Sequence, residues 1–559
     1  MSVKWSFALL LHPLVAVSFA AESTADFKTE ICVYGGTASG VIAAVQGVRM
    51  GHKVILVSPS ASLGGMTSNG LGQTDVSKKR SIVAGLARKF YEDIFTYYRQ
   101  ESSWKQQQRR DYTPSISVEP NETAWWNFEP HVAEAIFRSY VRENGIVLLA
   151  RERLDLARAV EKENGRILAI RLESGRRVRA AVFIDASYEG DLLAKAGVSY
   201  RVGREANAEF GETINGVQPL PPERAANHQL PQNISAYIRP GDRTSGLLPG
   251  IEAASLLAPG AADRRVQAYA FRLCLTDDPE NRLSISRPTD YDERDYELLF
   301  RSFEAGAERV PWINSAMPNR KTDINNYGGF SMNLIGGSDD YPEGNYATRE
   351  RIRERHRRYQ AGLLWTLAQH PRVPASVQAI VAPWGLAKDE FKDNGGWPEE
   401  IYVREARRMR GALVMTERHC AGQIMAHDAI ALGAYTMDSH HTQRYIDADG
   451  HVRNEGNIQI RVSTPYPIGY DAITPLAEEC TNLLVSVCLS ATHTAYGSIR
   501  MEPVLMMLGQ SAATAAAQAL EQKTTVQKID RTKLRDRLLA DRQLLAWPRA
   551  SSDPTSIAK

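Results

Sequence analysis

A short segment near the carboxyl end gathers side chains that could move a proton and stabilise negative charge. It reads SATHTAYGSIRMEP from Ser490 to Pro503. Histidine exchanges protons near neutral pH, so His493 is a candidate general base for a substrate hydroxyl or amine group. Tyr496 and Arg500 are candidates for stabilising charge beside it. The alternative for each side chain is an ordinary structural hydrogen bond.

A second polar region precedes this segment. His440 and His441 lie in YTMDSHHTQRY, and His440 is a further candidate base. A dense group of arginines lies in YVREARRMRG and comprises Arg404, Arg407, Arg408 and Arg410. Helical spacing would place the first three on one side, where they could bind a carboxylate, a sugar or a phosphate. A solvated face paired with Glu405 is the alternative.

Glycines near the amino end have a spacing that suits a diphosphate. Residues 31–34 and 53–57 read as β-strands, and the sequence GGTASG between them opens an apolar helix that stops near Gly51. In such a unit Gly35 permits a tight turn and Gly40 lets the helix pack closely on the sheet. The helix N-terminus then faces the diphosphate. The candidate contacts are Gly35, Gly36, Thr37, Ala38, Ser39 and Gly40.

Two positions depart from the usual dinucleotide pattern. Thr37 stands where the middle glycine is expected, and its hydroxyl could donate a hydrogen bond to a phosphate. Ser58, followed by Pro59, stands where an acidic residue usually binds the ribose. Ser58 is therefore a candidate contact, and the ribose acid is unassigned.

Two later segments extend the candidate nucleotide site. In LGGMTSNG the backbone at Gly64, Gly65 and Met66 can approach a diphosphate because little side chain blocks it. Residues 153–185 read as a meander with turns at Asn164-Gly165 and Ser174-Gly175. A strand over residues 182–184 then leads into Asp185 and, shortly after, Asp191. Either carboxylate could anchor a ribose or a water near the diphosphate, and a helix N-cap is an equal alternative.

Taken together, these segments resemble the FAD-dependent oxidoreductase family of bacterial proteins sometimes labelled xanthan-lyase-related. The matching stretches are VYGGTASGVIAA, LGGMTSNGLGQTD, FEPHVAEAIF, FIDASYEGDLLAKAGVSYRVGRE, YVREARRMRG, YTMDSHHTQRY and HTAYGSIRMEPVLMMLGQSA. The resemblance implies a glutathione-reductase-like FAD-binding domain with an inserted substrate domain. It also implies that a strand over residues 482–489 returns to that domain. The helix starting at Pro503 would then point its dipole at the flavin, and Arg500 would add a full charge.

Composition narrows the class of protein. The 559 residues suggest two or three domains, and a net charge of +2 gives no support for a nucleic-acid partner. Five cysteines without a CxxC pair favour neither a disulfide framework nor a metal site. Residues 1–20 read as a secretory signal peptide, with an uncleaved membrane anchor as the alternative. No later stretch is long and apolar enough to span a bilayer.

We therefore expect an α/β fold in which a Rossmann-like FAD-binding domain carries an inserted α+β substrate domain. The predicted segments are 1–20 (signal peptide), 27–205 (FAD domain, first part), 206–400 (insert), 401–525 (return) and 526–559 (helical tail). The expected function is exported, FAD-dependent hydride abstraction from a C–OH or C–NH group of a small molecule or oligosaccharide. The electron acceptor is unassigned. The alternatives are an FAD-containing lyase or isomerase without net redox, and a non-catalytic carbohydrate-binding protein.

Overall fold

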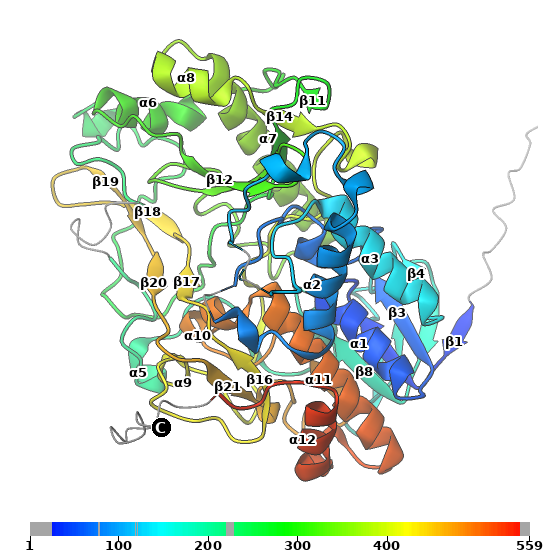
Figure 1. Ribbon diagram of the computed structural model, residues 1–559. Coiled ribbons are helices and arrows are strands. Elements are labelled where there is room, and N and C mark those ends of the chain that lie inside the picture. The colour runs from blue at the N-terminus through cyan, green and yellow to red at the C-terminus, as the bar shows by residue number, and fades with distance from the viewer. Residues whose placement is uncertain (1–24, 77–78, 118, 120, 220–227, 548–559) are drawn as a thin grey trace, which may run out of the picture.

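The computed structural model describes residues 25–76, 79–117, 119, 121–219 and 228–547 (Figure 1). The predicted signal peptide lies outside these residues. A parallel sheet lies on the side of the molecule that carries the amino end, a second sheet with its own helices caps the top, and two-stranded ribbons fill the opposite side.

The central sheet is parallel and has the strand order β22-β8-β2-β3-β4. Its strands are β2 (Ile31–Tyr34), β3 (Val54–Ser58), β4 (Val147–Ala150), β8 (Val182–Asp185) and β22 (Leu483–Val485). Apolar runs of four or five residues form β2, β3 and β8, which are buried along their whole length. Strand order reverses beside β2, and this reversal opens a crevice at the carboxyl ends of the strands where ligands of such sheets bind.

Helices cover this sheet and join distant parts of the chain. They are α1 (Ala38–Arg49), α2 (Gly85–Tyr98), α3 (Pro130–Glu143), α11 (Glu502–Glu521) and α12 (Arg531–Ala540). Helix α11 is buried over eighteen of its residues and crosses α1 so closely that a Cβ on Gly509 would lie 2.2 Å from the Ser39 carbonyl oxygen. Helix α11 therefore packs directly against the first βαβ unit.

A small sheet beside the central one matches the meander expected between residues 153 and 185. Its order is β1-β7-β6-β5, with β1 (Asp26–Lys28), β5 (Val160–Glu163), β6 (Arg166–Arg171) and β7 (Arg177–Arg179). Both predicted turns are present, since Asn164, Gly165 and Gly175 have positive φ.

The second large sheet is built between β8 and β22, which are neighbours in the central sheet. Its order is β11-β14-β10-β13-β12 and its neighbours run antiparallel. It contains β10 (Cys274–Thr276), β11 (Arg282–Leu283), β12 (Trp312–Met317), β13 (Lys321–Asn326) and β14 (Gly385–Ala387), with helices α6 (Glu297–Glu304), α7 (Tyr346–Gln369) and α8 (Ala375–Val381). This arrangement confirms a Rossmann-like α/β fold with an inserted α+β part. The exact boundaries at residues 205 and 400 stay predictions.

Short elements complete the chain. The ribbons pair β16 (Ala429–Gly433) with β21 (Tyr466–Gly469), β17 (Met437–Ser439) with β20 (Ile458–Ile460), β18 (Gln443–Ile446) with β19 (Val452–Glu455), and β9 (Tyr200–Arg201) with β15 (Arg408–Met409). The short helices are α4 (Asp191–Lys195), α5 (Asn207–Phe210), α9 (Glu417–Cys420) and α10 (His493–Ile499). All five cysteines are buried and free. Over the described residues, the helices contain no stretch both long and apolar enough to cross a bilayer.

Three local expectations were wrong. Residues 401–407 are not helical and lead into β15, so the arginines of this segment diverge instead of sharing a helix face. The strand expected over residues 482–489 is only β22, because the chain turns away after Val485. His493 is not in a loop but is the first residue of α10, which Thr492 caps through its side chain.

Candidate functional site

A cavity of about 180 Å³ lies at the carboxyl ends of β2 and β8, at the strand-order reversal. It is lined by Tyr34, the Gly35–Thr37 turn, Pro59, Ser60, Arg153, residues 187–189, Asp191, Tyr341, Tyr346, Arg349, Glu350, Arg353 and residues 399–401 and 403. The predicted glycine turn therefore forms one wall of a cavity in the place where sheets of this kind bind nucleotides.

Steric contacts explain why glycine stands at three positions of this turn. Gly35 has a φ of +115°, and a Cβ on it would lie 2.6 Å from the Ala186 backbone. A Cβ on Gly40 would lie 1.9 Å from the Gly35 carbonyl oxygen. A Cβ on Gly36 would meet the Ser58 hydroxyl oxygen at 2.2 Å. Only glycine therefore lets β2, α1 and β8 meet this closely.

Thr37 has a structural role that differs from the one expected. Its hydroxyl donates to the Ala186 carbonyl oxygen at 2.8 Å and accepts from the Gly40 amide at 3.1 Å. The proton that was predicted to reach a phosphate is thus already used. Thr37 instead caps α1, whose first-turn amides, at Ala38 and Ser39, have no acceptor within the helix and suit an anion.

Ser58 is fully buried, and its hydroxyl donates to the Ser60 carbonyl oxygen at 2.8 Å. Its side chain therefore supports the turn after β3 and does not reach into the cavity. The cavity wall at this point is made by Pro59 and Ser60.

The second glycine pair lies under a tyrosine. Gly64 and Gly65 both have positive φ, and a Cβ on Gly65 would lie 2.2 Å from the Tyr188 phenolic oxygen. That oxygen accepts from the Met66 amide at 2.8 Å and donates to Glu502 at 2.7 Å. Burial raises the pKa of Glu502 to about 7. This contact joins the glycine pair to the N-terminus of α11.

Asp185 and Asp191, the two predicted contacts, have different roles. Asp185 is fully buried, with Oδ1 accepting from Ser187 and Oδ2 from the Leu193 amide, so it orders the turn after β8. Asp191 lines the cavity and holds Arg349 through two hydrogen bonds of 2.6 and 2.8 Å and Arg407 at 2.8 Å. Arg349, in the first turns of α7, is therefore buried and paired.

One extended segment separates this cavity from a second polar region. Ile401 and Val403 face the cavity. Tyr402 and Arg404 alternate with them, and the Tyr402 hydroxyl accepts from Arg500 at 2.7 Å. We call the polar residues on that far side, Tyr402, Arg404, Asp438, His440 and Arg500, the Asp438 cluster.

Strand β17 presents the central pair of this cluster. Asp438 and His440 lie two residues apart and on the same face, 18% and 13% exposed, whereas Met437 and Ser439 are buried on the other face. His440 Nε2 lies 3.3 Å from Asp438 Oδ2, and Arg500 donates to the same oxygen at 3.0 Å. A histidine oriented by a carboxylate is the arrangement of a general base.

Electrostatic interactions keep Asp438 ionised and His440 neutral near pH 7. Burial opposes ionisation of Asp438, but His440 and Arg500 outweigh it and hold its pKa at about 2. Burial, with Arg404 adding to it, lowers the pKa of His440 to about 3. The imidazole is therefore neutral near pH 7 and has a lone pair to accept a proton.

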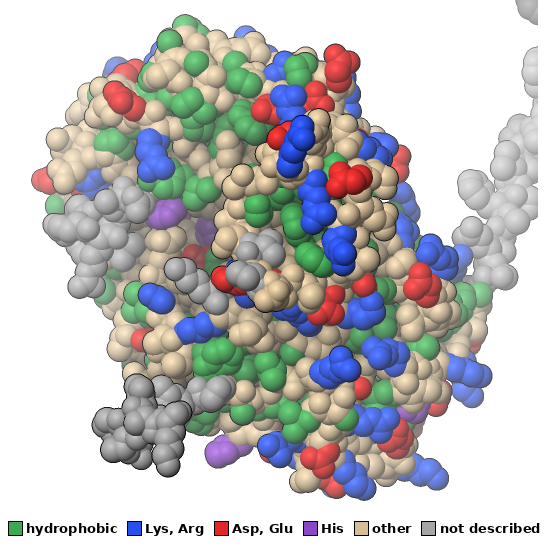
Figure 2. All heavy atoms as spheres, viewed as in Figure 1, with side chains coloured by type: hydrophobic (Ala, Val, Ile, Leu, Met, Phe, Trp, Pro, Cys, Tyr) green, Lys and Arg blue, Asp and Glu red, His purple; other side chains and the backbone are tan. Residues whose placement is uncertain are grey.

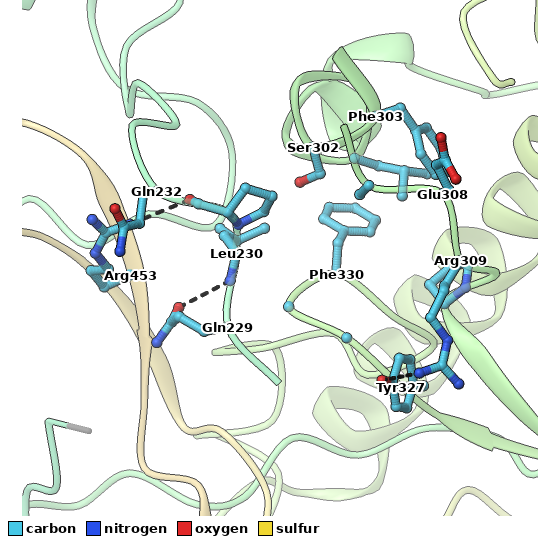
Figure 3. Close-up of a pocket in the computed structure, with 16 residues that line it drawn as sticks. Gln229, Leu230, Gln232, Ser302, Phe303, Glu308, Arg309, Tyr327, Phe330 and Arg453 are labelled. Carbon is cyan, nitrogen blue, oxygen red and sulfur yellow. Dashed lines mark hydrogen bonds between the residues drawn. The ribbon is translucent and has the colours of Figure 1, made fainter. Parts of the chain in front are cut away.

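One cavity reaches the cluster, and a second lies near it. The first, of about 540 Å³, is lined by Asp438 itself together with Lys79, residues 434–436, Gln459, Arg461 and Val462. The other, of about 440 Å³, has Phe303 and Phe330 on one side and Gln229, Gln232 and Arg453 facing them (Figure 3). His228 links them: its ring is 5.9 Å from that of Tyr327 on the second cavity, and its Nε2 is 3.3 Å from Gln459 Nε2. Figure 2 shows histidine side chains at the surface in the left half of the view, with hydrophobic side chains among their neighbours.

His493 is placed differently from His440. Its Nε2 lies 2.9 Å from the Ser439 hydroxyl and its Nδ1 lies 2.9 Å from Glu405. These three side chains have the order of a serine–histidine–acid triad, but all are at most 1% exposed. Tyr496, one turn along α10, is 3% exposed. We therefore read His493 as a residue that locks β17 against α10, beneath the Asp438 cluster.

Sequence reasoning missed several members of this region. Tyr402 and Asp438 were passed over, although Asp438 stands two residues before His440, the spacing that shares a strand face. Two further residues come from the insert and were not recognised from the sequence. They are Arg272, which Asp323 holds at 2.9 Å, and Asn333, whose Nδ2 lies 3.0 Å from His440 Nδ1. A polar pair on a short strand was the one available clue.

A parallel sheet with a glycine turn entering a helix at the strand-order reversal defines a dinucleotide-binding protein. The chain matches the family described as FAD dependent oxidoreductase over residues 30–538, and it belongs to that family. It is accordingly an FAD-dependent oxidoreductase with FAD as its cofactor. A comparison with curated protein sequences finds no match.

Solved structures offer weaker likenesses. The L-amino acid deaminase from Proteus vulgaris is 14% identical with a TM-score of 0.24, over 33% of this chain and 53% of that one. The flavin-containing monooxygenase from Stenotrophomonas maltophilia is 15% identical with a TM-score of 0.19, over 33% and 44%. The chain thus spans about half the length of the deaminase it matches. Likenesses at these TM-scores carry no argument about activity.

Proposed function

We propose that this enzyme oxidises a C–OH or C–NH group of a small molecule or saccharide at the Asp438 cluster. The observation that carries the proposal is the Asp438–His440 pair, which opens to a cavity on one side and adjoins the wall of the nucleotide cavity on the other. Aromatic rings and amides in the neighbouring cavity of Figure 3 suit a saccharide, because rings stack on sugar faces and amides bond hydroxyls.

The residues present fit FAD at both ends of its path. The Gly35–Thr37 turn and the first-turn amides of α1 would hold the diphosphate, and Arg153 lies in the same cavity. The N-terminus of α11 with Arg500 would stabilise negative charge on the ring. When bound, FAD accepts two electrons and a hydrogen from the substrate carbon as a hydride at N5.

The chain's own residues handle the proton. As the C–H bond breaks, the substrate hydroxyl or amine must lose its proton, and His440 is the neutral base on the same side of the β17 segment as Asp438, which lines the cavity. The Nδ1 of His440 lies 3.0 Å from the Asn333 amide nitrogen. In this scheme the substrate hydroxyl or amine takes the place of that amide as the hydrogen-bond donor to Nδ1. Asp438 accepts the hydrogen bond from Nε2 and stabilises the imidazolium that forms.

An anaerobic titration tests this proposal. The FAD-loaded protein is mixed with sugars, polyols, amines and amino and hydroxy acids, and the flavin absorbance is followed without oxygen. A true substrate bleaches the flavin in proportion to the amount added. If no compound bleaches it but one is converted at unchanged flavin absorbance, the enzyme is instead a lyase or isomerase without net redox.

We also propose that the chain is exported. The support is the composition of residues 1–20, where one lysine precedes an apolar run that ends in small residues. Amino-terminal sequencing of the protein from its native host tests this: a mature end near residue 21 supports cleavage, and an intact first residue contradicts it.

A further inference from the structure

Arg404 is a buried arginine whose hydrogen-bonding capacity is only partly used. It is 1% exposed, and within the described part of the chain it makes no ion pair. Among the described residues its side chain donates to the Ala268 carbonyl oxygen at 2.5 Å, its guanidinium lies 4.7 Å from the centre of the Tyr402 ring, and its Nε has no partner. Asp438 favours the charged form of Arg404 without pairing with it. An anion that reached Nε would offset the cost of burying this charge.

The neighbouring cations are already paired. Arg272 is held by Asp323 at 2.9 Å and Arg500 by Asp438 at 3.0 Å. Both arginines act with burial to lower the pKa of Arg404 to about 9, which leaves it charged near neutral pH. Asp75, a further buried carboxyl of this region, raises the pKa of Arg272 and Arg500 and makes no ion pair with Arg404.

Other polar atoms around His440 are also unsatisfied. Gln267 accepts from the His440 amide, and Asn333 bonds the His440 ring. Gln267 Nε2, Asn333 Oδ1 and Arg500 Nε are buried and have no partner among the residues that the structure describes. With Arg404 Nε, the region offers three unused donors and one unused acceptor. A ligand that satisfies it must present mostly acceptor oxygens.

We propose that Arg404, with Gln267, binds a carboxylate of the substrate. The substrate is then an organic acid, such as a hydroxy acid, an amino acid or a sugar acid, and not a neutral sugar. The carboxylate site does not depend on the proposed function. Only the position of the oxidised carbon beside His440 rests on that function.

Binding without turnover tests the site. The FAD-loaded full chain is titrated by calorimetry with lactate and glucuronate, and with lactamide and glucose as their neutral partners. The wild type is expected to bind the acids and not the neutral compounds. Arg404→Gln should weaken acid binding on the order of 10- to 100-fold, the range for a lost charged hydrogen bond, and Arg404→Lys should weaken it less.

Arg410→Gln is the matched control, because Arg410 is exposed and its side chain bonds only Glu209, at 3.0 Å, among the described residues. It should bind acids like the wild type. Flavin content and near-ultraviolet circular dichroism report the folding of each variant. If Arg404→Gln does not fold, Arg404→Lys takes its place in the binding test.

Three binding results would overturn the inference. They are acids that fail to bind the wild type, neutral partners that bind as tightly as acids, and an Arg404→Gln variant that keeps full acid affinity. A folded Arg404→Gln protein that loses FAD would also overturn it, since Arg404 would then serve the cofactor. If acids bind through Arg404 but never reduce the flavin, the carboxylate site stands and the proposed function fails.

Discussion

Replacing His440 by glutamine separates the two histidines that the sequence offers as bases. Glutamine keeps a hydrogen-bonding group near Asp438 and Asn333 but cannot take up a proton. His493→Gln is the comparison, because His493 is 0% exposed and both its ring nitrogens are engaged. His440→Gln should lose the chemical step, and His493→Gln should lose stability.

The structure sets the size of each effect. Loss of a positioned general base lowers the rate of the chemical step by about 10²- to 10⁴-fold, so His440→Gln should slow flavin reduction by that factor at unchanged stability. In His493→Gln the Glu405 carboxylate loses one partner and keeps Arg408 at 3.2 Å. That loss should lower the free energy of unfolding by about 2 kcal/mol, as for a hydrogen bond to a charged group.

Stopped-flow absorbance without oxygen measures flavin reduction, and urea unfolding measures stability. Both use the substrate and protein from the anaerobic titration. The reasoning is refuted if His440→Gln reduces its flavin at the wild-type rate. It is equally refuted if His493→Gln is as stable as the wild type but loses the chemical step, because His493 would then be the base.

Further predictions concern the nucleotide site. Gly40→Ala should abolish FAD retention on purification, because its Cβ would lie 1.9 Å from the Gly35 oxygen. Gly51→Ala is the comparison: its φ of +86° makes alanine strained there, but its Cβ would meet no atom within 4 Å, so it should lose some stability and keep the flavin; equal flavin content in both would contradict this. Burial raises the pKa of Glu502 from 4.5 to about 7, so folding favours its protonated form and stability falls as pH rises from about 4.5 to 7. Glu502→Gln should therefore be more stable than the wild type at pH 8, by up to about 3 kcal/mol, and equal to it below pH 4.5; urea unfolding at both pH values checks this, and a constant difference would contradict it.

The nucleotide-binding half of the fold could be read from the sequence because its constraints are local. A strand, a glycine turn and an apolar helix occupy neighbouring residues, and the glycines at 35 and 40 are fixed by clashes that any side chain would make. The same holds for the turn at Asn164 and Gly165, whose positive φ follows from residue type.

The candidate active site could be predicted only in part because its partners lie far apart in sequence. His440 was recognised by its chemistry, but its contacts with Asn333 and Gln267 come from the insert. The arginine run was assigned to a helix from spacing alone, whereas tertiary pairing draws Arg407 to Asp191 and Arg408 to Glu205. Such pairings depend on which segments meet across the sheets, which spacing within one segment does not encode.

The central claim is that the Asp438 cluster lies at the flavin, and a crystal structure of the FAD-loaded protein tests it most directly. The account predicts the adenosine in the cavity beside Gly35 and Ser187, and the flavin ring against Tyr402 and Arg500 with His440 on its open side. A flavin ring that contacts none of the Asp438 cluster would contradict the account.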